Sequence, residues 1–219
     1  KLTVMDKWLI SKLNSMVKAV DENLNNYKIP EAAKALQNFV DEMSNWYVRR
    51  NRERYWVQSM TEDKITAYMV LYKALVTTAK AAAPMIPFMA ESIYQNLVRS
   101  VDKSAPESIH LCEFPEYDIS AIDEKLEQDM ETVLEIVVLG RAARNGAVLK
   151  NRQPLNRMFI SCSKKLSEYF TDIIKDELNI KNVVFTDEVD GFVNYTFKPQ
   201  LKTLGPKYGK NLGEIRTAL

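Results

Sequence analysis

Apolar residues recur at the spacing of an α-helix through the first hundred residues of the chain, and this periodicity restricts the fold more than any other feature. It predicts helices over residues of about 3–24, 30–55, 61–79 and 87–98, with short connections between them. Pro30 suits the first turn of the second helix, because the first N–H groups of a helix have no partner within it. Four successive helices with short connections pack antiparallel, so we predict a helical bundle.

The same periodicity predicts which residues face the bundle core. In the first helix they include Leu9, Leu13 and Val20. In the third helix they are Ile65, Tyr68, Met69, Tyr72, Leu75, Val76 and Ala79, and in the fourth they are Met89, Ile93 and Leu97. Each set lies along one side of its helix, so each is expected to be buried.

The pattern changes near residue 150. A fifth helix is predicted over residues 123–145, with Val138 on its apolar side and Gly146 as its C-terminal cap. The elements expected beyond it are a strand at 158–162, a helix at 165–178 and strands at 182–186 and 192–197. The predicted fold is therefore mainly α, with an antiparallel helical bundle over residues 1–150 followed by a small α/β appended domain over residues 151–219. Neither end carries the signals that usually begin and end a protein, so we expect a piece of a longer polypeptide.

Composition excludes several functional classes. The 219 residues carry a net charge of +1, which argues against a protein that coats nucleic acid indiscriminately. Cys112 and Cys162 are too far apart for a zinc or disulfide motif, which favours a reduced, cytoplasmic location. No apolar run is long enough for a membrane span, and a monomer is the default expectation.

The sequence lacks the residue sets of an active site. His110, the only histidine, lies in a short segment, 109–111, that is predicted to be extended, and we expect a structural or surface role for it. There is no glycine-rich loop that would cradle a phosphate. The chain should therefore bind rather than catalyse, with no catalytic residue, metal site or cofactor of its own.

Residues 45–56 hold four arginines and four aromatic residues, a concentration that stands out in a nearly neutral chain. On a continuous helix, the apolar stripe through Tyr47 would continue to Arg50 and Arg54. The residues that would face away from the core are Asn45, Arg49, Arg52 and Trp56. One interpretation is a solvated helix end paired with carboxylates. The other is an RNA surface, because guanidinium groups match phosphates and aromatic rings stack on bases.

The segment 45–56 strongly resembles the anticodon-binding helical bundle of class I aminoacyl-tRNA synthetases for aliphatic amino acids. Segments 82–91 and 107–115 resemble later parts of the same bundle. Segments 140–145, 150–155 and 198–210 are similar to isoleucyl-tRNA synthetases, and valyl-tRNA synthetases match them less well. The resemblance covers nearly the whole chain.

This resemblance implies a tRNA-binding part of an isoleucine-tRNA ligase that recognises the anticodon stem-loop of isoleucine tRNA. The full-length enzyme would use ATP and magnesium in catalytic and editing domains, whose signature motifs do not occur in these residues. The candidate RNA-binding residues are Asn45, Trp46, Arg49, Arg50, Arg52, Arg54, Trp56, Lys150, Arg152, Lys207 and Lys210. The alternatives are the same region of a valyl-tRNA synthetase and a helical scaffold that contacts protein rather than RNA.

The candidates are expected to differ in role. Arg49 and Arg52 should contact phosphates, Trp46 or Trp56 should stack on a base, and Asn45 should bond a base edge. Arg50 and Arg54 continue the core stripe, so pairing with a buried carboxylate or contact with the catalytic domain is equally open for them. Two basic segments lie in predicted turns, one with Lys150 and Arg152 and the other with Lys202, Lys207 and Lys210. Of these residues, Lys150, Arg152, Lys207 and Lys210 form a second candidate surface.

Overall fold

The structure is a computed structural model that describes residues 1–162, 164–186, 200–209 and 213. The chain divides into two compact units, Lys1–Glu131 and Thr132–Leu219, which are considered separately here. The fold is mainly helical with one small parallel sheet, which confirms the predicted class. The domain boundary predicted at residue 150 falls inside the second unit and stays a prediction.

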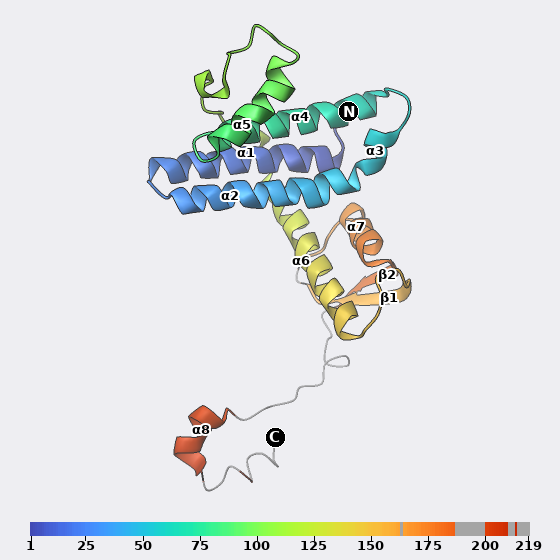
Figure 1. Ribbon diagram of the computed structural model, residues 1–219. Helices are drawn as coiled ribbons and strands as arrows, with labels where there is room; N and C mark the ends of the chain where they lie inside the picture. Colours follow the sequence, from blue (N-terminus) through green and yellow to red (C-terminus); the bar gives the residue numbers. More distant parts are fainter. Residues whose placement is uncertain (163, 187–199, 210–212, 214–219) are drawn as a thin grey trace. The chain divides into compact units, whose positions relative to one another are not determined.

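The regular structure described in the first unit is entirely helical (Figure 1). Its elements are α1 (Val4–Asn25), α2 (Ile29–Glu42), the π-helix η1 (Met43–Val48), α3 (Arg52–Trp56), α4 (Glu62–Ala82), α5 (Pro87–Tyr94), the π-helix η2 (Gln95–Arg99), the 3-10 helices η3 (Ile109–Leu111) and η4 (Ile119–Ala121), and the start of α6 (Glu124–Gly146). Both α2 and α4 pack on α1, so the predicted bundle is confirmed.

Helix α1 is the centre of this unit. It begins with a capping box, in which Thr3 Oγ1 accepts from the Asp6 N–H (3.1 Å) and Asp6 Oδ2 accepts from the Thr3 N–H (2.8 Å). Its predicted apolar face is confirmed, because Leu9, Leu13 and Val20 are all buried. The helix therefore supplies a fixed base for the residues that pack on its N-terminal turn.

The predicted core face of α4 is largely wrong. Ile65, Tyr68, Met69 and Tyr72 are exposed, whereas the buried residues are Ala67, Val70, Ala74, Thr78, Ala79, Ala81 and Ala82. Small side chains let helix backbones approach closely. Because α4 carries apolar residues on two sides, its periodicity alone did not indicate that the alanine-rich side would be the buried one.

The region after α4 also differs from the prediction. Met89 of α5 is 63% exposed, and Ala90 and Tyr94 are buried in its place. Buried Tyr94 donates from its hydroxyl to Pro106 O (2.9 Å), which ties α5 to the connection that follows. Segment Ile109–Leu111 is a 3-10 helix rather than an extended piece, with Ser108 Oγ accepting from the His110 N–H (3.2 Å). His110 itself is exposed, at the protein surface.

The second unit contains a β–α–β arrangement. Strands β1 (Leu155–Ile160) and β2 (Ile180–Phe185) pair in parallel, with Arg157 opposite Asn182, and α7 (Glu168–Leu178) connects them. Both strands begin two or three residues earlier than predicted, and the helix begins three residues later. The third strand predicted at 192–197 lies outside the described residues.

Two further expectations for this unit need correction. Val138 of α6 is 62% exposed instead of buried. Lys202 and Lys207 lie on α8 (Leu201–Tyr208), not in turns, and Lys210 lies outside the described residues. Helix α6 ends at Gly146 as expected, but the left-handed backbone that follows it belongs to Val148, with φ 57°.

Gly140 lets α6 approach α7 closely. A Cβ atom at this position would lie 2.4 Å from Cδ1 and 3.0 Å from Cδ2 of Leu178, a side chain with 0% exposure. Such distances are shorter than real Cβ contacts, and a buried leucine has little room to move. The absence of a side chain at Gly140 is therefore required by the packing of α7.

We expect Gly140→Ala to lower the free energy of unfolding by about 1 kcal/mol, because the overpacking cost exceeds the helix propensity that alanine adds. Gly146→Ala is the matched control, since nothing lies within 4 Å of its added Cβ. That control should be neutral or slightly stabilising. Urea denaturation measures both, and equal stabilisation of the two variants would contradict the packing role of Gly140.

Candidate nucleic-acid interface

The arginine-rich stretch is not one continuous α-helix. Helix α2 passes into the π-helix η1 at Met43, a turn interrupts the helix at Asn51, and α3 begins at Arg52. Each π-type hydrogen bond spans five residues instead of four, so directions projected at 100° per residue no longer hold beyond Met43. Buried Asn51 stabilises the turn, because its Nδ2 donates to Tyr47 O (2.8 Å).

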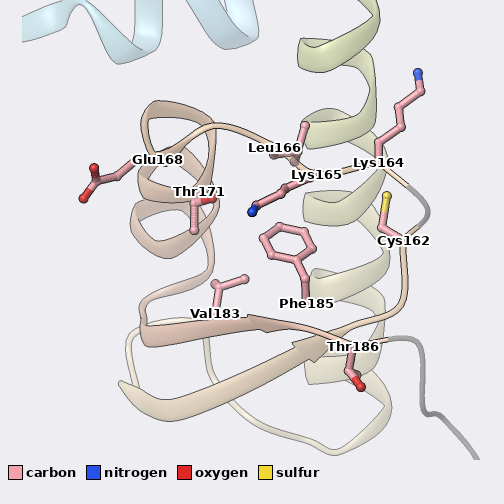
Figure 2. Close-up of a pocket in the computed structure, with 9 residues that line it drawn as sticks. All are labelled: Cys162, Lys164, Lys165, Leu166, Glu168, Thr171, Val183, Phe185 and Thr186. Carbon is pink, nitrogen blue, oxygen red and sulfur yellow. The ribbon is translucent and has the colours of Figure 1, made fainter.

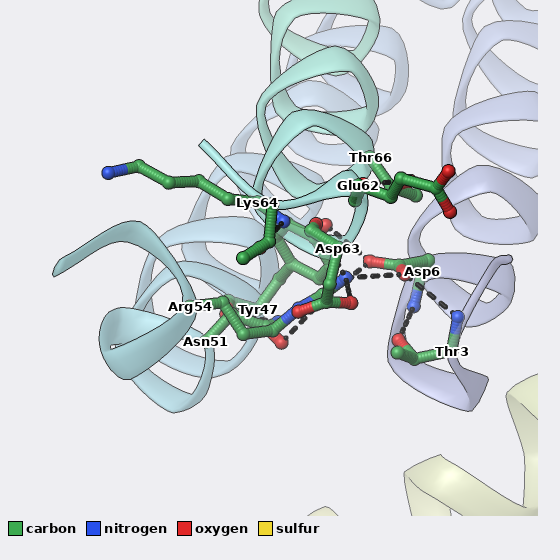
Figure 3. A network of polar contacts seen from close by, with 10 residues as sticks. Thr3, Asp6, Tyr47, Asn51, Arg54, Glu62, Asp63, Lys64 and Thr66 are labelled. Carbon is green, nitrogen blue, oxygen red and sulfur yellow. Dashed lines mark hydrogen bonds and ion pairs between the residues drawn. The ribbon is translucent and has the colours of Figure 1, made fainter. Parts of the chain in front are cut away.

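Arg54 is held inside a network of protein carboxylates (Figure 3). Its Nη1 and Nη2 atoms donate to Asp6 Oδ1 (2.8 Å) and Oδ2 (3.0 Å), a bidentate pair. Its Nε and Nη2 donate to the carboxylate of Asp63 (2.8 and 2.7 Å), and Nη1 also donates to Asn51 Oδ1 (3.0 Å). Arg54 therefore joins the starts of α1 and α4 to α3.

The same carboxylate of Asp6 also anchors the π-helix. The Tyr47 hydroxyl donates to Asp6 Oδ1 (2.6 Å), and both residues are completely buried. The alternative of pairing with a buried carboxylate is confirmed for Arg54, and its RNA role stays a prediction. Asp6 and Tyr47 were missed as partners, because they lie 41 positions apart in the sequence and nothing between them signals their contact.

The charges in this network perturb one another. Burial by itself raises the pKa of Asp6, but the hydrogen bonds from Arg54, Tyr47 and Thr3 outweigh burial and hold its pKa at about 2, below the ordinary value of 3.8. Burial and the hydrogen bond to Asp6 raise the pKa of Tyr47, which stays a neutral donor. The network therefore ties the arginine-rich stretch to the start of α1 through Asp6.

The Asp6 contribution to stability should depend on pH. Because its folded-state pKa lies below 3.8, the contribution is complete above that value and is lost as pH falls through about 2. The lowering of the Asp6 pKa corresponds to about 2 kcal/mol in the free energy of unfolding. Unfolding free energies of wild type and Asp6→Asn, measured from about pH 5 to pH 2, should converge at acid pH. A constant difference between the two curves would contradict this linkage.

A second set of residues in the stretch is exposed. The Arg52 guanidinium lies 5.2 Å from the ring centroid of Trp56, a residue that is 71% exposed. The Arg49 guanidinium lies 5.7 Å from the ring centroid of half-buried Trp46, and its Nε donates to Asn45 O (2.8 Å). Each pair therefore places a cation over an indole ring at the protein surface.

The remaining candidates lie on separate elements. Arg50, between η1 and α3, is half-buried. Lys150 and Arg152 are exposed in the turn before β1, and Lys207 is exposed on α8. Asn45, Trp46, Arg49, Arg52 and Trp56 all belong to the first unit, within the stretch from η1 to α3.

The second unit has a cavity of about 590 Å³ that the sequence did not indicate. Figure 2 shows Lys165 and Phe185 directed toward it, with Thr171 of α7 nearby. Its walls come from the segment before α7, from α7 and from the end of β2, and short motifs do not reveal such an assembly. Among the helices described, none is long and apolar enough to cross a membrane.

Comparison with known proteins is informative for most of the chain. Residues 6–160 match the model of a family described as the anticodon-binding domain of tRNA ligase. The chain is 57% identical over 216 residues to an isoleucine–tRNA ligase of Clostridium novyi, covering 99% of the chain and 21% of that ligase. It is 42% identical over 220 residues to the isoleucine–tRNA ligase of Thermus thermophilus, covering 98% of the chain and 21% of that ligase. The chain thus spans about a fifth of the length of these relatives.

Proposed function

Because the chain belongs to the anticodon-binding domain family of tRNA ligases, we propose that it binds isoleucine tRNA through the anticodon stem-loop. The proposal relies most on the exposed pairing of Arg52 with Trp56. A guanidinium can hold a phosphate and an indole can stack on an unpaired base, and these are the two contacts that single-stranded loops of RNA offer. Arg54 lies on the same helix, α3, and its ion pairs with Asp6 and Asp63 would keep that helix rigid for binding.

Roles for the other candidates follow from their chemistry. Arg49 and Arg50 would contribute phosphate contacts, Trp46 a second stacking surface, and Asn45 a hydrogen bond to a base edge. Lys150 and Arg152 would contact the RNA backbone from the second unit, together with the lysines Lys207 and Lys210. Phosphate contacts supply affinity, whereas contacts to the anticodon bases supply discrimination.

We further propose that the complete protein is an isoleucine–tRNA ligase. ATP and magnesium would serve a catalytic domain, which together with an editing domain would lie outside the residues of this chain. Binding at the anticodon would then set the register of the tRNA on the catalytic domain. A cytoplasmic monomer remains our expectation.

The proposal is tested by fluorescence titration of the chain with three RNAs at low salt. These are isoleucine tRNA, valine tRNA and an isoleucine tRNA that carries the valine anticodon. We expect the first to bind tightest, with the anticodon exchange weakening binding by about tenfold, as the loss of one base contact would do.

Each other result selects an alternative. A preference for valine tRNA would indicate the corresponding region of a valyl-tRNA synthetase. Equal affinity for the three RNAs would keep RNA binding and remove anticodon reading. No binding at low salt would overturn the proposed function in favour of a scaffold that contacts protein.

A further inference from the structure

The turn at residues 150–153 carries Lys150 and Arg152, and all four of its carbonyl oxygens accept hydrogen bonds from side chains on other elements. Arg144 Nη1 donates to Lys150 O (3.1 Å), and its Nη2 donates to Gln153 O (2.8 Å). Asn179 Nδ2 donates to Asn151 O (3.2 Å) and to Arg152 O (3.0 Å). The turn is therefore held through its backbone.

Both donors are themselves firmly placed. Arg144, on α6, is 4% exposed, and its Nε and Nη2 also donate to Leu178 O (3.1 and 2.7 Å). Asn179 ends α7 in the left-handed conformation (φ 51°, ψ 57°), and its carbonyl accepts from the Leu155 N–H (3.0 Å) at the start of β1. The turn is thus attached to the point where α6, α7 and β1 meet.

We propose that Arg144 and Asn179 are positioning residues that hold the turn as a preformed contact for the phosphate backbone of RNA. This inference rests on the proposed function. With its carbonyl oxygens bound by these donors, the turn directs less partial negative charge toward an approaching phosphate. Because the backbone is ordered before binding, Lys150 and Arg152 lose less conformational freedom when they meet RNA.

Asn179→Gly is the variant that separates positioning from folding. Glycine adopts the left-handed conformation readily, so the helix end is kept while both bonds from Nδ2 are lost. Removal of buried Arg144 would instead leave several carbonyls unpaired and would unfold the unit. Asn182→Ala is the matched control, because Asn182 Nδ2 also donates to a backbone carbonyl, Asn156 O (3.2 Å), outside the turn.

Affinity of the 219-residue chain for isoleucine tRNA is the measurement. We expect Lys150→Ala with Arg152→Ala to weaken binding about tenfold or more. Asn179→Gly should weaken it about threefold to tenfold, through the lost ordering, and Asn182→Ala should leave it unchanged. The decisive variant combines Asn179→Gly with the two alanines, and it should bind no more weakly than the two alanines alone.

The outcomes distinguish this inference from the proposed function. If the loss from Asn179→Gly adds to the loss from the two alanines, or if Asn182→Ala weakens binding as much as Asn179→Gly, then Asn179 does not act by positioning the turn. If the two alanines leave the affinity unchanged while the wild-type chain binds, the turn is not an RNA contact. The proposed RNA contact at Arg52 and Trp56 is not affected by that result. If the wild-type chain does not bind tRNA, both the inference and the proposed function fail.

Discussion

Replacing Asp6 with Asn is expected to lower the free energy of unfolding by about 3 kcal/mol, the largest effect on stability that we predict. The carboxylate has 0% exposure and forms the bidentate pair with Arg54, whose side chain is 15% exposed. Asparagine has nearly the same volume but offers one acceptor oxygen and no charge. The Arg54 guanidinium would lose its buried counterion, and the Tyr47 hydroxyl would donate to a weaker acceptor. Urea denaturation near neutral pH measures the change.

Asp63→Asn is the matched control for this variant. Asp63 binds the same guanidinium at 2.7 Å, but its side chain is 51% exposed. Solvent screens that pair, so we expect a loss of no more than about 1 kcal/mol. Equal losses for the two variants would contradict the view that burial of Asp6, and not the number of ion pairs at Arg54, determines the stability of this network.

Arg52→Ala is expected to weaken binding of isoleucine tRNA by about 1 to 3 kcal/mol, or roughly fivefold to 150-fold. The side chain is exposed and lies over the Trp56 ring, so its removal takes away a phosphate contact and one partner of the stacked pair. The dependence of affinity on salt should also become less steep, by about one released counterion. Titrations at several salt concentrations give both quantities.

Lys28→Ala is the matched control for Arg52→Ala. Lys28 is an exposed cation immediately before α2, at the end opposite η1. Its removal changes the net charge by the same amount and should leave the affinity and the salt slope nearly unchanged. The same slope for wild type and Arg52→Ala would show that Arg52 does not contact a phosphate.

The outcome at α4 shows a limit of sequence periodicity. Periodicity predicted the helix and its start near residue 61, because both depend on residues close together in the chain, and the structure places Thr61 as its N-cap. It did not give the buried face, since the choice between Met69 and Ala74 depends on how closely α1 approaches. The lengths of the connections indicate that helices pack antiparallel, but they do not determine which sides make contact.

The candidate interface was likewise predicted in part from the sequence. Its composition, two tryptophans among four arginines, made an RNA surface one of two interpretations, and the resemblance of the segment to class I synthetases suggested the family. Helical projection also predicted that Arg52 faces away from the core and that Arg54 continues the core stripe, and the exposure of the two residues agrees. It left the partner of Arg54 open. Asp6, which binds Arg54, is 48 residues away in sequence.

The sequence by itself determined the mainly α class, the approximate helices, the parallel strands' approximate positions and the arginine-rich stretch, because local periodicity, capping and composition carry this information. The sequence also predicted that Arg52 faces away from the core and left two roles open for Arg54, and only the tertiary structure decided that Arg54 pairs with Asp6. The physical reason is that the burial of a charge depends on a partner from a distant segment. The carboxylate of Asp6 compensates the desolvation of the Arg54 guanidinium, and that pairing exists only after the helices have packed.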